Sequence, residues 1–450
     1  MTAGSNAPLT LEDLGTAVEL GDIDTVVLAL TDMQGRLQGK RFHARHFLDA
    51  IAEHEAEACN YLLAVDVEMN TVGGYAMSSW ERGYGDFAMK PDLTTLRLTP
   101  WQEGTALCLS DLAWGDGEPV NPSPRQVLRR QLDRLAERGW TANAGTELEF
   151  MLFRTSYEDA HKLGYTGLEP ANLYNVDYSL LGTARVEPLI RRIRNAMHGA
   201  GLHVENSKGE CNLGQHEINF RYQHALRAAD EHVVFKNGAK EIAAQDGMAI
   251  TFMAKFDARE GNSCHIHLSL AREDGSAVFA DEPETFDRFV AGLLATLPEL
   301  TLFLAPNVNS YKRFAEGSFA PTTVAWGTDN RTCSLRVVGH GAAKRVECRL
   351  GGADLNPYLG LAAMLAGGLH GIDQELELEP PVDGNAYVSD KPRVPATLRD
   401  ARDLFAVSPI ARGAFGDEVV DHYVNNARIE LAAFGAAVTD WERVRGFERM

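Results

Sequence analysis

The chain has 450 residues, of which 63 are acidic and 43 basic, and its formal net charge is -20. This length is enough for two domains, or for one large and one small domain, and it excludes a small disulfide-stapled scaffold. The negative charge has the wrong sign for nucleic acid or for anionic lipid surfaces, so we expect neither as a partner.

The cysteines and the apolar segments indicate a cytoplasmic location. None of the six cysteines is part of a C-x-x-C pair, as is typical of reduced thiols in the cytosol. The first ten residues, MTAGSNAPLT, lack a basic region followed by an apolar stretch, so we expect no export signal. The most apolar later segment, residues 292–308, is broken by Pro298, Glu299 and Pro306, so we expect no membrane span.

Residues 1–120 are predicted to form a small β-rich domain. Residues 10–21 are predicted to form a short helix, and residues 24–42 two strands joined by a turn at 32–35, because β-branched and apolar residues flank a turn that contains glycine. Residues 70–91 are dense in Gly, Ser and aromatic residues, which favours an ordered loop over a helix or a strand. We expect this loop to reach a neighbouring site.

Residues 121–450 are predicted to form a larger domain. Pro-rich residues 121–124 indicate the boundary, and a helix follows from Pro124 to a stop at Gly139. Helical patterns also cover 357–372 and the region after 397. The whole predicts an α+β fold with antiparallel strands and helices packed on one side. Between these helices, strand-like runs alternate with amphipathic segments at 141–153, 187–200, 210–222, 249–256 and 263–270.

Two carboxylates stand two residues apart in the sequence TELEF. Glu147 and Glu149 fall in a run that otherwise reads as a buried strand, so both side chains point to the same face. A solvated strand face explains most isolated pairs of this kind, and binding of a hard divalent cation is the alternative. The pair alone does not decide between them.

Further carboxylates and two imidazoles follow along the chain. Glu210 and Glu217 flank a glycine-centred bend, His265 and His267 share one strand face, and Glu347 stands between two arginines. A lone histidine on a strand usually has a structural role, but this combination raises the case for metal. Together the residues offer oxygen and nitrogen ligands for two or three Mg²⁺ or Mn²⁺ ions.

Arginines cluster in the last third of the chain. A guanidinium group grips carboxylate or phosphate through two contacts and keeps its charge, which is what phosphoryl transfer requires. A surface role is the alternative for each of them. No Walker-type G-x-x-x-x-G-K-[ST] sequence occurs, so ATP would be held in another way. The cluster consists of Arg313, Arg331, Arg336, Arg345 and Arg349.

The order of these motifs resembles the glutamine synthetase superfamily over nearly the whole chain. TELEF, KGECNLGQHEINFRY, GNSCHIHLSL, NVNSYKRF, NRTCSLRV and RVECRLGGADLNPYL occur in the family's order with similar intervals. The resemblance implies a β-grasp-like domain in residues 1–120 and a catalytic domain in residues 121–450, whose curved antiparallel sheet is backed by helices. It also implies a homododecamer of two hexameric rings.

The resemblance implies ligands for two metal ions and for the glutamate substrate. One ion, near the glutamate and the amine, would be held by Glu149, Glu210 and Glu217. The other, which orients the phosphates of ATP, would be held by Glu147, His265 and Glu347. The glutamate substrate would contact Gly261, Arg313, Arg331 and Arg349.

The resemblance also implies ATP-binding and catalytic residues. The γ-carboxylate of glutamate would take the γ-phosphoryl group of ATP, and an amine would then displace phosphate from the mixed anhydride. The residues at ATP or the moving phosphoryl group would be His267, Arg331, Arg336 and Arg345, with Tyr222 and Ser269 at the adenine. The catalytic residues would be Asp86, Glu217, Arg331 and Arg336.

The chain departs from true glutamine synthetases where ammonium binds. The Asp-Gly-Ser-Ser-like loop is replaced by TVGGYAMSSW at 71–80, although Asp86 matches a family acidic position. Phe319 stands where the family places a glutamate that deprotonates ammonium, and Glu316 is the nearby carboxylate that could substitute for it. Tyr174 or Tyr178 would line the amine entrance.

These departures predict a nucleophile larger than ammonia. Loss of two carboxylates lowers the expected affinity for ammonium and leaves an apolar surface suited to an alkyl amine. In these changes the chain resembles the γ-glutamylpolyamine and γ-glutamylethanolamide synthetases, so we expect a glutamate–amine ligase that uses ethanolamine. Putrescine or spermidine, ammonium, and a non-enzymatic scaffold remain the alternatives.

Overall fold

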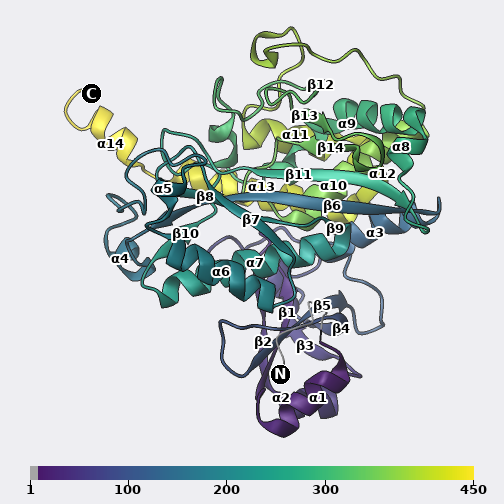
Figure 1. Cartoon of the computed structure of the whole chain (residues 1–450), viewed down its shortest axis with the longest axis vertical. Coiled ribbons are helices and arrows are strands. Elements are labelled where there is room, and N and C mark those ends of the chain that lie inside the picture. The colour runs from purple at the N-terminus through teal and green to yellow at the C-terminus, as the bar shows by residue number, and fades with distance from the viewer. Residues whose placement is uncertain (1–8) are drawn as a thin grey trace.

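The computed structural model describes residues 9–450 and has a small N-terminal lobe and a large body (Figure 1). Two sheets that share no strand lie within residues 25–113 and 140–348. Helices accompany both, so the expected α+β class is confirmed. Most of the N-terminal stretch on which the expectation about an export signal depends, residues 1–8, lies outside the described residues.

The small lobe is a five-stranded sheet with a helix beside it. Its strand order is β2-β1-β5-β4-β3, in which β1 and β5 are parallel and the other neighbours antiparallel. The predicted helix begins at Thr10, which forms a capping box with Asp13, and ends at Gly21 with a φ of 78°. The elements are α1 (Leu11–Leu20), β1 (Thr25–Thr31), β2 (Leu37–His43), α2 (Ala44–His46), β3 (Ala56–Cys59), β4 (Asp86–Leu98) and β5 (Thr105–Ala113).

The loop predicted over residues 70–91 is shorter than expected. Strand β4 already begins at Asp86, because the apolar Phe87 and Met89 are buried in the sheet. Within the loop, the ring of Tyr75 packs 4.6 Å from that of His422 in helix α13 (Asp417–Ala436). The loop is therefore held against the large body of its own chain.

The large sheet is built around strand β6. Its order is β12-β13-β14-β11-β6-β8-β7, with β9 and β10 also paired to β6. All pairs are antiparallel as expected, except that β12 runs parallel to β13. The strands are β6 (Trp140–Phe153), β7 (Val204–Gly209), β8 (Gln215–Phe220), β9 (Gln223–His224), β10 (Ala249–Thr251), β11 (Cys264–Arg272), β12 (Trp326–Thr328), β13 (Leu335–Val338) and β14 (Arg345–Cys348).

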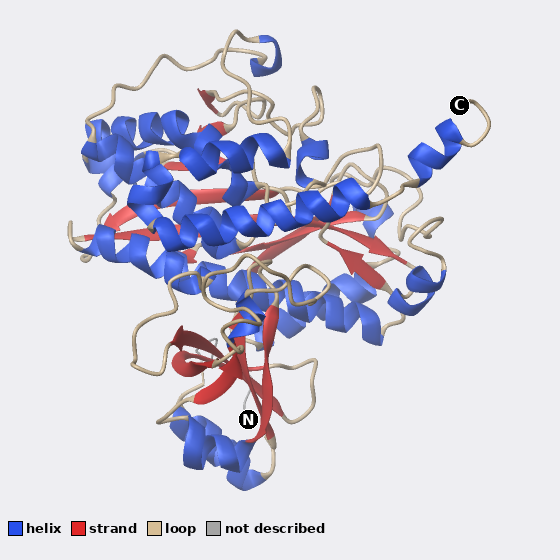
Figure 2. Ribbon diagram, turned by 180° about the vertical axis from the view of Figure 1, so that it is seen from behind, coloured by secondary structure: helices blue, strands red, loops and turns tan. Residues whose placement is uncertain are grey.

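Helices lie across one side of this sheet (Figure 2). The segment 292–308, expected to be interrupted, is helical as far as residue 304 despite Pro298. No helix within residues 9–450 is both long and apolar enough to cross a membrane. The helices of the body are α3 (Pro124–Ala136), α4 (Tyr157–Lys162), α5 (Leu180–Thr183), α6 (Glu187–Gly199), α7 (Ala225–Gln245), α8 (Val278–Asp281), α9 (Pro283–Leu304), α10 (Pro357–Asp373), α11 (Leu398–Val407), α12 (Pro409–Phe415), α13 and α14 (Asp440–Gly446).

The two long helices α9 and α10 touch through glycine. A Cβ added to Gly292 of α9 would lie 2.6 Å from the Cα of Gly371 in α10, which no side chain tolerates. The backbones therefore come into direct contact and present a continuous apolar layer to the sheet. Ile266 of β11 packs against this layer: a Cβ added to Gly360 of α10 would lie 3.0 Å from the Cδ1 of Ile266.

One buried arginine joins the small lobe to the large body. Arg125 of α3 donates to Asp92 and Asp111 of the small sheet, each at 2.6 Å, and to Asp230 of α7 at 3.0 Å. The hydroxyl of Tyr358 in α10 donates to the same Asp230 at 2.6 Å. The side chain of Arg125 is only 3% exposed, so this network is shielded from water and fixes the two parts relative to each other.

Replacing Arg125 with alanine is expected to lower the free energy of unfolding by about 3–5 kcal/mol, because Asp230 would stay buried without its cationic partner. Urea denaturation followed by circular dichroism measures the loss. Arg129→Ala is the matched control: Arg129 contacts Asp92 and Asp111 but is 32% exposed, so we expect a loss of about 1 kcal/mol or less. Equal losses in the two variants would contradict the role of Arg125.

Candidate active site

The register of the large sheet brings the predicted carboxylates and imidazoles together. Glu147 on β6 pairs with His265 on β11, and Glu149 pairs with Glu217 on β8. Directly opposed residues of neighbouring strands share a face, and so do alternate residues of one strand. All four side chains therefore lie on the face of the sheet opposite the helices.

The row continues toward the edge of the sheet. His267 of β11 pairs with Glu347 of β14, which pairs in turn with Arg336 of β13. Glu347 is fully buried, and Arg336 Nη1 donates to it at 2.9 Å. Arg349 Nη1 donates to its other oxygen. Two guanidinium groups thus balance the charge of this carboxylate.

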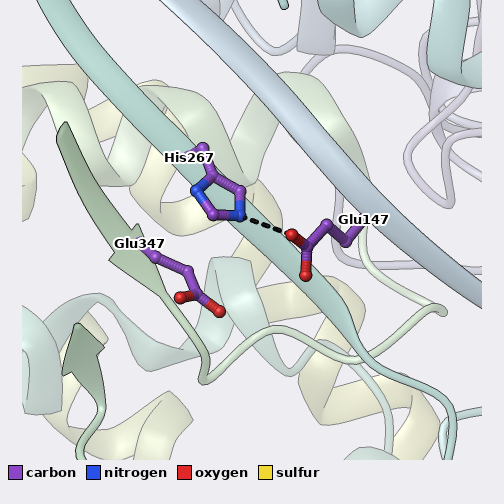
Figure 3. Close-up of side chains that lie close together, drawn as sticks. All are labelled: Glu147, His267 and Glu347. Carbon is purple, nitrogen blue, oxygen red and sulfur yellow. Dashed lines mark hydrogen bonds and ion pairs between the residues drawn. The ribbon is translucent and has the colours of Figure 1, made fainter. Parts of the chain in front are cut away.

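Glu147 and Glu347 flank the imidazole of His267 (Figure 3). Glu147 lies 2.9 Å from His267 Nε2 and 3.1 Å from His265 Nδ1. Burial opposes ionisation of Glu147, but the hydrogen bonds and charges of the two imidazoles outweigh it and hold its pKa well below its usual range. A carboxylate that stays ionised and is still partly exposed to the cleft is suited to bind a cation.

Either histidine can complete a set of three ligands with these glutamates. Donor atoms of Glu147, His267 and Glu347 lie within 4.8 Å of one another, so the structure brings His267, predicted to contact ATP, into the set. His265 Nδ1 lies 3.5 Å from Glu347, and its Nε2 is buried without a hydrogen-bond partner among residues 9–450. An unpaired buried nitrogen of this kind fits a site that binds a ligand.

A second group of carboxylates lies on the other side of β6. One oxygen from each of Glu149, Glu210 and Glu217 lies within 4.8 Å of the others. Burial and the charge of Glu149 raise the pKa of Glu217 to about 7. The ammonium group of Lys208 contacts Glu210 and lies 3.7 Å from Glu217. This donor set of hard oxygens with excess negative charge fits Mg²⁺ or Mn²⁺.

Arg313 lies beneath these residues and does not line the cleft. Its guanidinium donates to the backbone oxygens of Arg349, Leu350 and Gly351 at 2.7–3.1 Å. A Cβ on Gly261 would lie 3.0 Å from Arg313 Cγ, so glycine permits this close approach. Arg313 thus supports the segment that carries Arg349, and it would have to exchange these bonds to reach a substrate carboxylate.

The predicted residues open onto one cleft of about 300 Å³. At one wall stands the ring of Phe319, which is 57% exposed, and Tyr178 also lines the cleft. Arg349 Nε is buried there without a partner among residues 9–450. The predicted residues that line the cleft are Glu147, Glu149, Tyr178, Glu210, Glu217, Gly261, His265, Phe319, Arg331, Arg336 and Arg349.

Residues predicted to bind ATP continue along β11 beyond the carboxylates. Ser269 follows His267 on the same face, and Arg345 Nε lies 3.2 Å from His267 Nδ1. Tyr222 lies over Gly145 of β6, where an added Cβ would be 3.6 Å from the Cβ of Tyr222. These four side chains extend the site along β6 and β11.

Besides Arg313, three predicted residues lie apart from these side chains and from the cleft. Asp86 lies at the start of β4 in the small lobe, and Glu316 and Tyr174 are exposed on loops. None of them lines the cleft of this chain. The structure therefore does not show Glu316 in the position of the missing flap carboxylate.

Several lining residues were missed from the sequence. Glu149 accepts hydrogen bonds from Gln215 Nε2 at 3.1 Å and from the Ser263 backbone N–H at 2.7 Å. Alternate spacing could have found these two and Lys208, because each stands two residues before a predicted ligand. The loop residues Asp177, Cys211 and Glu260 had no such signal.

The thiol of Cys211 is held in its protonated form. Burial and the neighbouring charge of Asp177 raise its pKa to about 11. The thiol therefore donates a weak hydrogen bond to Asp177, with 3.5 Å between the sulfur and Oδ2. Cys211 accordingly behaves as a polar wall residue rather than as a nucleophile.

Comparisons with known proteins identify the family of this chain. The model of the glutamine synthetase catalytic domain matches residues 121–445. The chain is 64% identical over its whole length to γ-glutamylethanolamide synthetase GlnA4 of Streptomyces coelicolor, covering 98% of that protein. It is 39% identical to glutamate–isopropylamine ligase of a Pseudomonas species, over 95% of this chain and 96% of that one.

A solved structure has the same fold over nearly the whole of this chain. The GmaS/ADP complex superposes with a TM-score of 0.85 at 28% identity, over 97% of this chain and 99% of that one. The chain therefore belongs to the glutamine synthetase family, within its glutamate–amine ligases, which form carbon–nitrogen bonds. Members of this family use ATP and divalent metal ions.

Mg²⁺ binding is expected to become tighter between pH 6 and pH 8, because the ion must displace the proton that Glu217 holds below its pKa of about 7. Without metal, Glu217 lowers the free energy of unfolding as pH rises from 4.5, the ordinary pKa of a glutamate, to about 7, its pKa in the folded protein. Isothermal titration calorimetry in buffers of different ionisation enthalpy measures the released proton. If the affinity for Mg²⁺ does not change with pH and no proton is released at pH 6, Glu217 is not a ligand of the ion.

Proposed function

We propose that this protein is an ATP-dependent γ-glutamylethanolamide synthetase that joins the γ-carboxylate of glutamate to ethanolamine. The main support is the 64% identity over the full chain to the enzyme of that name. The apolar ring of Phe319 at the wall of the cleft is further support. The two carboxylate groups and the arginines beside them support the ligase chemistry.

The two clusters of carboxylates and histidines are proposed to bind two to three Mg²⁺ or Mn²⁺ ions. Such ions would neutralise the oxygens of the ATP phosphates. Glu149, Glu210 and Glu217 would hold the ion near the glutamate and amine. Glu147, His265 and Glu347 would hold the ion near the phosphates, with His267 within reach of both this ion and ATP.

The arginines are proposed to bind the substrates' anionic groups. Arg349, whose Nε is unpaired, would grip the α-carboxylate of glutamate together with Arg331, beside Gly261. Arg313 would either support Arg349 or join it after exchanging its backbone bonds. Arg336 and Arg345 would stabilise the phosphoryl group in transfer.

The reaction would proceed in two balanced steps. An oxygen of the glutamate γ-carboxylate attacks the γ-phosphorus of ATP, ADP leaves, and γ-glutamyl phosphate forms. The amine nitrogen, having lost one proton, attacks the acyl carbon; the bond from that carbon to the phosphate oxygen breaks, inorganic phosphate leaves, and nitrogen loses its second proton. Glu217, ionised once metal is bound, would lie beside this second step.

The site is proposed to be completed by a neighbouring subunit in a cytoplasmic homododecamer of two hexameric rings. Asp86 is exposed at the tip of β4 and does not line the cleft of its own chain. A neighbouring copy could therefore supply this carboxylate to the cleft. Light scattering measures the oligomeric state.

Phosphate release with glutamate, ATP and Mg²⁺ should be fastest with ethanolamine in a panel that also contains ammonium, putrescine and spermidine. The apolar ring of Phe319 favours a carbon chain over ammonium. A mass-spectrometric assay for the γ-glutamyl amide verifies the product. Turnover with ammonium alone, or with polyamines alone, would refute the choice of ethanolamine.

Glu147→Ala and Glu347→Ala should each abolish phosphate release with every amine, because the phosphate-orienting ion loses a carboxylate ligand. The same assay of phosphate release measures this loss of activity. Glu316→Ala is a suitable control, since Glu316 does not line the cleft and should leave at least half of the activity. Full activity in either metal-site variant would refute the ligand assignment.

A further inference from the structure

An amine such as ethanolamine is a cation in neutral water, so its binding site needs a carboxylate that has no other partner. Most acidic residues of the cleft are already engaged. Glu147 faces two imidazoles, Glu149 accepts hydrogen bonds from Gln215 and Ser263, and Glu210 and Glu217 face Lys208. The remaining carboxylates that line the cleft are Asp177 and Glu260.

Asp177 has almost no partner of its own. Its side chain is exposed, and its one side-chain partner within residues 9–450 is the thiol of Cys211, a weak donor at 3.5 Å. One of its oxygens lies within 4.8 Å of a ligand atom of Glu210. Asp177 thus has an unused negative charge in the cleft, next to the carboxylate group that contains Glu210.

The residue next to Asp177 provides a surface for a short carbon chain. Tyr178 lines the same cleft, and the ammonium group of Lys208 lies 4.9 Å from the centre of its ring. Lys208 covers one face of the ring, as cations do at aromatic faces, and Tyr178 is still 73% exposed. Glu260 instead precedes Gly261, which the proposed function places at the backbone end of glutamate.

The cleft is independently marked as a ligand site. His265 Nε2 and Arg349 Nε are buried in its wall without partners among residues 9–450. Both side chains are more than nine-tenths buried, so their polar atoms are satisfied when a ligand occupies the cleft. Asp177 lines the same cleft.

We infer that Asp177 is the carboxylate that binds the ammonium group of the amine substrate, with Tyr178 and Phe319 against its carbon chain. This inference rests on the proposed function. It assigns to a loop residue the recognition of positive charge that Phe319 cannot provide. A charge-assisted hydrogen bond from the ammonium group to Asp177 then positions the nitrogen beside the site of acyl phosphate formation.

Asp177→Asn keeps the shape of the side chain and removes its charge. At saturating glutamate and ATP, the KM for ethanolamine should rise about fivefold, the effect of one exposed ion pair. The KM values for glutamate and ATP should stay within about twofold. Asp177→Glu, which restores the charge, should recover most of the affinity. An unchanged KM for ethanolamine in Asp177→Asn would overturn the inference.

Hydroxylamine separates recognition of charge from a structural role. It is a primary nucleophile that is largely uncharged at pH 7.5, so its turnover should change by less than about twofold in Asp177→Asn. Equal losses with hydroxylamine and ethanolamine would overturn the inference, because they would show a structural defect. Asp116→Asn is the matched control: Asp116 is exposed in the small lobe, and this variant should leave both amines unaffected.

The role of Asp177 and the proposed enzyme activity are contradicted by different results. If the wild-type protein releases phosphate with ethanolamine and Asp177→Asn retains its KM, Asp177 alone is wrongly assigned. If the wild-type protein releases no phosphate with any amine, the proposed function fails and the assignment of Asp177 fails with it.

Discussion

The pairing of β6 with β8 and β11 is the constraint on which the cleft depends. It sets Glu147 opposite His265 and Glu149 opposite Glu217. A shift of one residue would turn both glutamates of β6 to the helix-covered face, where Phe150 now packs 6.3 Å from Phe235 of α7. That alternative would bury two unpaired charges in an apolar layer, so hydrophobic packing on one face fixes the chemistry on the other.

The cleft and the residues next to it combine groups of different charge. Arg336 and Arg345 are cationic groups suited to phosphate, and Arg345 donates to the imidazole of His267. Two groups of carboxylates suit metal ions. Phe319 and Tyr178 add aromatic surface to the same cleft, which Asp177 also lines. Two anionic substrates and one cationic substrate can thus be distinguished by position, without a separate binding domain for each.

Much of this arrangement could be predicted because it follows strand periodicity. TELEF and CHIHL carry their polar residues at alternate positions, so the sequence indicated one face for each pair. The same periodicity could have identified Lys208, Gln215 and Ser263. The prediction was wrong about the end of the loop at 70–91, because Phe87 and Met89 are buried in a strand that begins earlier. Asp177 could not be predicted, since its place in the cleft comes from a loop and from long-range packing.

The central claim is that glutamate is activated by transfer of a phosphoryl group to its γ-carboxylate. Glutamate labelled with ¹⁸O in that carboxylate, incubated with ATP, Mg²⁺ and ethanolamine, tests it directly, because the bond that breaks in the second step joins the acyl carbon to a former carboxylate oxygen. Each inorganic phosphate released is expected to carry one ¹⁸O atom, as read by mass spectrometry. Release of phosphate without ¹⁸O, alongside formation of the amide, would contradict this claim.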